Sequence, residues 1–139
     1  MKTSNPTNMG THHIAITASN FDHSYQFYVN GLGMKPVASW GSGEQRAAML
    51  DIGDGTCIEL FAGGNPDDLP QEENKLGLIH LAFDVISPDI SYQRALEFGA
   101  QSRTEPTDIT LDAQPQPLHL RIAFVYGPDR EVLEFFHKK

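Results

Sequence analysis

Two histidines and two glutamates occupy matching positions in a pattern that the chain contains twice. Residues 13–17 read His-Ile-Ala-Ile-Thr and residues 80–84 read His-Leu-Ala-Phe-Asp, and a shift of 67 residues without a gap aligns the two copies. Each copy later reaches an apolar run centred on a glutamate. Imidazole nitrogens and carboxylate oxygens are ligands for divalent metals. The pattern predicts a metal site made of His13, Glu59, His80 and Glu134.

Taken singly, each of these residues has a simpler interpretation. A lone histidine on a strand is more often a hydrogen-bonded structural residue than a ligand, and a lone glutamate on a half-exposed strand is usually solvated. Strand alternation, however, places all four on one face, with apolar neighbours such as Ile14, Ile58, Leu81 and Leu133 on the other. Two carboxylates that share a poorly solvated cavity repel each other, and a cation removes that cost. We therefore expect one divalent ion, with Ni²⁺, Co²⁺ or Zn²⁺ favoured and Fe²⁺ or Mn²⁺ also compatible.

The elements that position these residues form the order β-α-β-β-β twice. In the first half, glycines and a capping Asn20 or Asp22 delimit the segments. The predicted strands there are residues 11–18, 34–40, 44–52 and 56–62, with a helix ending near residue 30. The second half has predicted strands at 78–85, 100–105, 118–126 and 131–137 and a helix from Pro88 to about Phe98. A polar loop with two prolines, residues 107–117, is long enough to suggest a functional lid.

This repeat predicts an α+β fold. One β-α-β-β-β unit cannot bury both faces of its sheet, so we expect two tandem modules that form a curved, barrel-like sheet around a metal cavity, with the helices outside. The predicted single domain spans residues 10–139. It divides into module one (10–62), a linker (63–76) and module two (77–137), and residues 1–9 form a flexible lead-in.

Composition excludes several classes of function. The 139 residues include 18 acidic and 10 basic ones, for a formal net charge of −8, so no basic surface is expected for nucleic acid. No apolar run is long enough to span a membrane, and residues 1–9 lack the apolar core of a secretory signal. Cys57 is the only cysteine, which rules out an internal disulfide and favours a cytoplasmic location.

The chain resembles the vicinal oxygen chelate superfamily, which includes glyoxalase I, bleomycin- and fosfomycin-resistance proteins, methylmalonyl-CoA epimerase and extradiol dioxygenases. The resemblance covers residues 11–137. It is carried by these motifs: His13-Ile-Ala-Ile, Phe27-Tyr28 before Gly31-Leu32-Gly33-Met34, Ile58-Glu59-Leu60, Ile79-His80-Leu81-Ala82-Phe83, Arg121-Ile122-Ala123-Phe124, Gly127-Pro128-Asp129 and Leu133-Glu134-Phe135.

The ligand order is similar to that of bacterial-type glyoxalase I (lactoylglutathione lyase). That resemblance implies a lyase or isomerase in which a metal chelates a carbonyl/hydroxyl pair of the substrate and Glu134, or its counterpart Glu59, moves a proton. Thr17 and Gly63 replace an arginine and an asparagine typical of the glutathione-using enzymes, so glutathione adducts are doubtful substrates. Two alternatives stay open: an Fe²⁺ ring-cleaving dioxygenase that uses only His13, His80 and Glu134, and a non-catalytic small-molecule binding or resistance protein.

Five further residues are predicted to line the substrate pocket. Arg121 is placed in the inward phase of its strand, where it could bind an anionic group or simply be a salt-bridged strand arginine. The others are Trp40, Phe61, Phe136 and His119. Small members of the superfamily are usually homodimers, and some exchange modules so that each site takes ligands from both chains. We expect a homodimer that acts on a small molecule.

Overall fold

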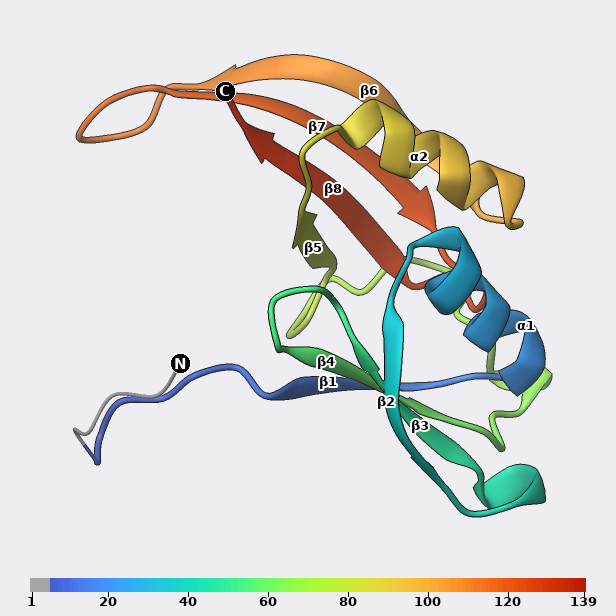
Figure 1. The fold of residues 1–139 in the computed structure, drawn as a ribbon. Helices are drawn as coiled ribbons and strands as arrows, with labels where there is room; N and C mark the ends of the chain where they lie inside the picture. The colour runs from blue at the N-terminus through green and yellow to red at the C-terminus, as the bar shows by residue number, and fades with distance from the viewer. Residues whose placement is uncertain (1–5) are drawn as a thin grey trace.

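The computed structural model describes residues 6–139, which form two similar modules (Figure 1). In module one the elements are β1 (His13–Thr17), α1 (Phe21–Gln26), β2 (Lys35–Trp40), β3 (Ala47–Asp51) and β4 (Cys57–Phe61). In module two they are β5 (Leu81–Asp84), α2 (Pro88–Glu97), β6 (Gln101–Leu111), β7 (Leu118–Tyr126) and β8 (Val132–Lys138). The four-stranded sheets have the orders β1-β4-β3-β2 and β5-β8-β7-β6. The predicted α+β class and the β-α-β-β-β repeat are confirmed.

Both helices begin at side-chain caps, and for the first helix the cap is Asn20, one of the two predicted candidates. The Asn20 side chain accepts a hydrogen bond from the backbone N–H of His23 at 3.1 Å, and Ser87 Oγ accepts one from Ile90 N–H at 3.2 Å. Helix α1 continues into a π-helical turn, η1 (Phe27–Gly31). Helix α2 ends before Gly99, whose φ of +102° lies in the region that favours glycine.

The predicted lid at residues 107–117 is shorter than expected, because its first five residues belong to a strand. β6 runs from Gln101 to Leu111 and pairs with β7 along its length, which leaves only residues 112–117 as a hairpin loop. The strand continues through Pro106, which has no backbone N–H to donate. It is tolerated because β6 is the edge strand of its sheet and its pairing with β7 is shifted between Thr104 and Thr107.

A single hydrophobic core lies on the helix side of both sheets. Its largest side chains come from both modules and are almost fully buried: Phe27, Tyr28, Leu50, Ile58, Leu60, Val125, Leu133 and Phe135. Helices α1 and α2 lie on the same side of the molecule (Figure 1). Arg94 of α2 also donates from Nε to the Gly31 carbonyl of η1 at 3.0 Å. The modules of one chain therefore pack through their helices.

The sheets are curved but do not close into one barrel. Strands β1 and β5 are edges of their own sheets and do not pair with each other. The cavity predicted to be shared by both sheets is therefore not formed as a continuous sheet within one chain. The helix side of each sheet packs in the common core. Within residues 6–139, the opposite face of each sheet is not covered by a helix and is called its open face below.

A polar contact also joins the modules at the turn between β7 and β8. The hydroxyl of the buried Tyr28 donates to Glu131 Oε2 at 2.6 Å, and Asp129 N–H donates to Glu131 Oε1 at 2.7 Å. Ser19 N–H donates to Asp129 Oδ2 at 3.1 Å. Burial raises the pKa of Glu131, and the hydrogen bonds from Tyr28 and the backbone oppose that shift. The same surroundings, burial first, raise the pKa of Tyr28.

The free energy of unfolding of Glu131→Gln is expected to increase, relative to that of the wild type, as pH rises. Because the Glu131 pKa is raised in the folded state, its contribution is most favourable below the unfolded pKa and is lost as pH rises through the folded pKa. Glutamine does not titrate. Urea unfolding of both proteins at pH 4 and pH 7 measures the difference, with the exposed Glu72→Gln as control. If the difference in unfolding free energy between the two proteins is constant with pH, or changes in favour of the wild type, the raised pKa of Glu131 is contradicted.

The segment between the modules has little regular structure, as its composition predicted. It contains one 3-10 turn, Pro66–Asp68, and is fastened by Gly64 N–H to the Ala18 carbonyl at 3.0 Å and by Arg130 Nη1 to the Pro70 carbonyl at 2.8 Å. The predicted lead-in, residues 1–9, lies partly outside the described residues, which begin at residue 6. Among residues 6–139, none of the helices has the length and apolar character needed to cross a membrane.

Candidate metal centre

The first histidine and glutamate meet on the open face of module one. Strands β1 and β4 are parallel, and their register places His13 opposite Cys57 and Ala15 opposite Glu59, so both side chains project from the same face. His13 Nε2 lies 3.3 Å from Glu59 Oε1. The other ring nitrogen of His13, Nδ1, lies 2.8 Å from His12 Nδ1, a hydrogen bond that orients the ring. His13 is thus held with Nε2 towards the carboxylate.

Module two repeats this arrangement. His80 directly precedes β5, and its Nε2 lies 3.1 Å from Glu134 Oε1 on β8. The ring of Phe124, opposite Glu134 in the β7–β8 register, meets the His80 ring edge to face at 5.3 Å. Burial raises the pKa of Glu134, and the His80 imidazole and, more weakly, the Arg103 guanidinium oppose the shift. The glutamate side chains are only 17% and 12% exposed, while the histidines are more open.

One chain does not bring the two pairs together. Within residues 6–139, no three His, Cys, Asp or Glu side chains cluster closely enough to hold a metal ion. The structure joins His13 with Glu59 and His80 with Glu134, and so leaves each pair as half of the predicted four-ligand set. The predicted metal site is therefore a pair of half-sites in the single chain.

Three of the five predicted pocket residues lie on the open faces. Register places Trp40 and Phe61 on the same face as Glu59, and Phe136 on the same face as Glu134. Trp40 is 44% exposed at the edge strand β2. Trp40 and Phe61 therefore share the face that carries the first half-site, and Phe136 shares the face that carries the second.

The placement of Arg121 and His119 in the cavity is wrong. The odd-numbered residues of β7 face α2, because Ala123 and Val125 belong to the core beneath that helix. Arg121 pairs with Asp89 at the start of α2, at 2.6 and 2.8 Å, and with Asp108 at 3.1 Å. His119, two residues earlier, contacts Thr110 at 3.2 Å. The sequence had left open that Arg121 is a salt-bridged strand arginine, and the structure agrees with that alternative.

Arg103 is the residue that sequence reasoning missed. It sits at the register shift between Ser102 and Thr104 of β6, and its guanidinium lies over the Phe124 ring, 4.7 Å from the centroid. It therefore shares the face of His80 and Glu134. Strand alternation alone could not place it, because the irregular pairing changes which side chains face which way. The acidic composition of the linker was the one sequence feature that pointed to a basic partner, because Glu73 of the linker forms the ion pair with Arg103.

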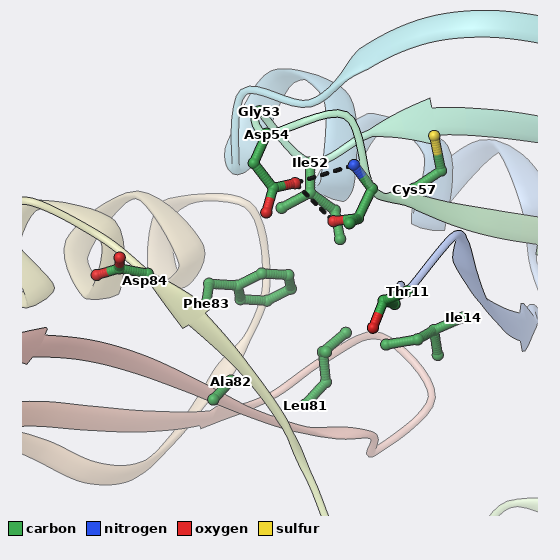
Figure 2. A pocket seen from close by; sticks show the side chains of 11 residues that line it. Thr11, Ile14, Ile52, Gly53, Asp54, Cys57, Leu81, Ala82, Phe83 and Asp84 are labelled. Carbon is green, nitrogen blue, oxygen red and sulfur yellow. Dashed lines mark hydrogen bonds between the residues drawn. The ribbon is translucent and has the colours of Figure 1, made fainter. Parts of the chain in front are cut away.

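A pocket of about 530 Å³ separates the two sheets and contains none of the four candidate ligands. Figure 2 shows Phe83 and Leu81 of β5 on one side and Ile52 and Ile14 of module one on the other. Asp54 accepts hydrogen bonds from Thr56 at its rim. This pocket marks the gap between the unpaired edges β1 and β5, and the candidate chemistry lies elsewhere, on the open faces.

Two curved β-α-β-β-β sheets, each with a histidine and a glutamate on its open face, define a recognisable class of protein. The profile of the Glyoxalase/Bleomycin resistance protein/Dioxygenase superfamily matches residues 10–135, and the chain belongs to this superfamily. It is 33% identical over 130 residues to an uncharacterized protein of Bacillus subtilis (strain 168), YwkD, with 91% of this chain and 95% of that protein covered.

Solved structures share this fold. A glyoxylase/bleomycin resistance protein/dioxygenase domain from Frankia sp. EAN1pec has a TM-score of 0.74 and 25% identity, over 96% of this chain and all of that one. The fosfomycin resistance protein FosX from Listeria monocytogenes has a TM-score of 0.66 and 18% identity, over 96% of each chain, which shows a shared fold.

Proposed function

We propose that this protein is a metal-dependent lyase or isomerase of the glyoxalase type, whose site is completed by a second copy of the chain. The observation that carries the proposal is the equivalence of the two half-sites. Each has one His Nε2 within 3.3 Å of one Glu Oε1, on the open face of a repeated sheet. His13 and Glu59 of one copy would meet His80 and Glu134 of the other.

The donor chemistry fits a divalent ion. Two imidazoles and two carboxylates form a nitrogen and oxygen set suited to Ni²⁺, Co²⁺ or Zn²⁺, with Fe²⁺ or Mn²⁺ also compatible. The glutamates are the less exposed members of each pair, so bringing the halves together without a cation would place two carboxylates in a poorly solvated space. When bound, the ion would polarise two adjacent substrate oxygens and so acidify the neighbouring C–H.

Unpartnered surface beside His80 supports the second copy. Leu76, Leu78 and Ile79 are 90%, 81% and 52% exposed in the segment that leads into His80. In the part of the chain that the structure describes, β1 and β5 each have one edge that pairs with no other strand. Exposed apolar side chains next to free strand edges are typical of a surface that another chain covers. A homodimer would cover them and join the half-sites in one step.

The proton transfer is assigned to Glu134. Its carboxylate, only 12% exposed beside His80, could take the proton from the carbon next to the chelated oxygens and return it to the adjacent carbon. Glu59, its counterpart, completes the ligand set. The aromatic side chains of Trp40, Phe61 and Phe136 on the same faces would limit access of water to the reacting atoms.

Elemental analysis after purification without chelators tests this function. We expect one divalent ion per chain, and Glu59→Ala should lower both metal content and isomerase turnover. An iron dioxygenase would instead be indifferent to Glu59→Ala and would consume oxygen with a catechol. Protein that never binds stoichiometric metal contradicts the proposal and favours a non-catalytic binder.

A further inference from the structure

A cation lies on the same face as the second half-site. Arg103 stacks on Phe124, whose ring in turn meets the ring of His80, so the guanidinium, the aromatic ring and the candidate ligand form a continuous row. Glu134 is directly opposite Phe124 in the β7–β8 pairing. Arg103 is about one-third exposed, so a small molecule bound at the half-site can reach it.

Contacts from the linker hold this guanidinium in one orientation. Glu73 accepts two hydrogen bonds, from Arg103 Nε at 2.8 Å and Nη2 at 3.0 Å, and the Tyr126 hydroxyl also donates to Glu73. These hydrogen bonds use the Nε side of the guanidinium. Among residues 6–139, the edge formed by Nη1 and Nη2 keeps free donors, since Nη1 has there only a contact of 3.5 Å to Thr104 Oγ1. Such an edge matches a planar carboxylate with two parallel hydrogen bonds.

Arg121 shows by contrast what a purely structural arginine looks like here. It uses Nε and Nη2 on Asp89 and Nη1 on Asp108, so both of its edges are engaged, and it lies beneath α2. Arg103 has one engaged edge and lies on the open face. In a chain of net charge −8, such an arrangement offers an anion a local binding point that the molecule as a whole does not.

We propose that Arg103 is a specificity residue that binds a carboxylate of the substrate, and that Glu73 positions it. The substrate would carry, besides two adjacent oxygens for the metal, one carboxylate within reach of the Nη1–Nη2 edge. A planar, singly charged group suits this single edge better than a phosphate, which calls for several donors. This inference rests on the proposed metal site, because the two oxygens and the carboxylate are bound together.

Hydroxamates on Co²⁺-loaded protein test the inference by affinity. Acetohydroxamate presents two vicinal oxygens without a carboxylate, and the monohydroxamates of malonic, succinic and glutaric acid add one at increasing reach. Visible titrations at constant ionic strength, which fixes the screening of the overall negative charge, give each dissociation constant. We expect the best carboxylate probe to bind about 10- to 100-fold more tightly than acetohydroxamate, as for a hydrogen-bonded ion pair.

Three variants separate recognition from folding. Arg103→Met should remove the preference for the carboxylate probes over acetohydroxamate, while acetohydroxamate affinity and melting temperature stay near wild type. Arg103→Lys should keep part of this preference. Arg121→Met, the matched control, should keep all of it. Equal binding of all probes by the wild type, or a preference that survives in Arg103→Met, overturns this inference and leaves the metal site standing. If Co²⁺ and acetohydroxamate do not bind at all, the proposed function fails and takes the inference with it.

Discussion

Glu134→Gln is expected to reduce isomerase turnover by about 10²- to 10⁴-fold, the usual contribution of a positioned general base. Glutamine keeps the size of the side chain and one oxygen that can still contact His80 and a metal, but it cannot take up a proton. Metal content should therefore stay near wild type while kcat falls. Turnover of methylglyoxal hemithioacetals made with a panel of small thiols, together with elemental analysis, measures both quantities.

Glu59→Gln is the matched control for this change. It makes the same replacement at the equivalent position of module one, where the structure places the glutamate 3.3 Å from its histidine. Because proton transfer is assigned to Glu134, the loss in Glu59→Gln should be smaller and should follow the metal content. Full activity of Glu134→Gln would remove this residue from the chemistry.

Phe135→Ala is expected to lower the free energy of unfolding by about 3–5 kcal/mol, as for large core aromatics. Phe135 is 1% exposed, stacks on Phe83 with ring centroids 6.1 Å apart, and belongs to the core that both modules share. The cavity left behind cannot close easily, because α2 and both sheets bound this region. Urea unfolding at one fixed protein concentration measures the loss, since association would add to apparent stability.

The neighbouring Phe136→Ala provides the control. Phe136 projects from the open face opposite Ile122 and is only partly buried, so its removal should cost about 1 kcal/mol. The two variants make the same chemical change one residue apart on the same strand. Equal losses would contradict the assignment of the core to the helix side of the sheet.

The sequence predicted the features that are encoded locally and by the repeat. Strand alternation separated Ile58 and Leu133 from Glu59 and Glu134, and the structure confirms those faces. The cap Asn20 was one of two predicted candidates, and it could be recognised because a side-chain acceptor at the start of a helix acts within three residues. Strand alternation and helix capping depend on residues close together in the sequence, so they can be predicted without knowledge of the tertiary structure.

What failed depends on irregular pairing and on how the modules meet. Residues 107–111 were predicted as part of a loop, but an edge position and a register shift let β6 continue through Pro106 to Leu111, so the predicted lid is reduced to residues 112–117. The phase assigned to Arg121 was wrong because alternation fixes two faces but not which one the helix covers. Arg103 was overlooked since its role depends on Phe124 and on Glu73, which lies 30 residues away in the linker. Whether the four ligands meet within one chain or between two was left open by the sequence, because no local pattern specifies how the helices of the modules pack.

A mixed dimer tests the split site most directly. One chain would carry His13→Ala with Glu59→Ala, the other would carry His80→Ala with Glu134→Ala, and two different affinity tags would isolate dimers that contain one of each. If each site combines module one of one copy with module two of the other, the mixed dimer has one intact site. We expect it to hold about half of the wild-type metal and activity.

The crossed control places all four substitutions in one chain and pairs it with a wild-type chain. A split site predicts no intact site in that dimer, whereas a site within one chain predicts about half of the wild-type metal. Metal in the first mixed dimer and none in the second is the result that the half-sites predict. The reverse pattern would show that His13, Glu59, His80 and Glu134 act within a single chain and would contradict the account.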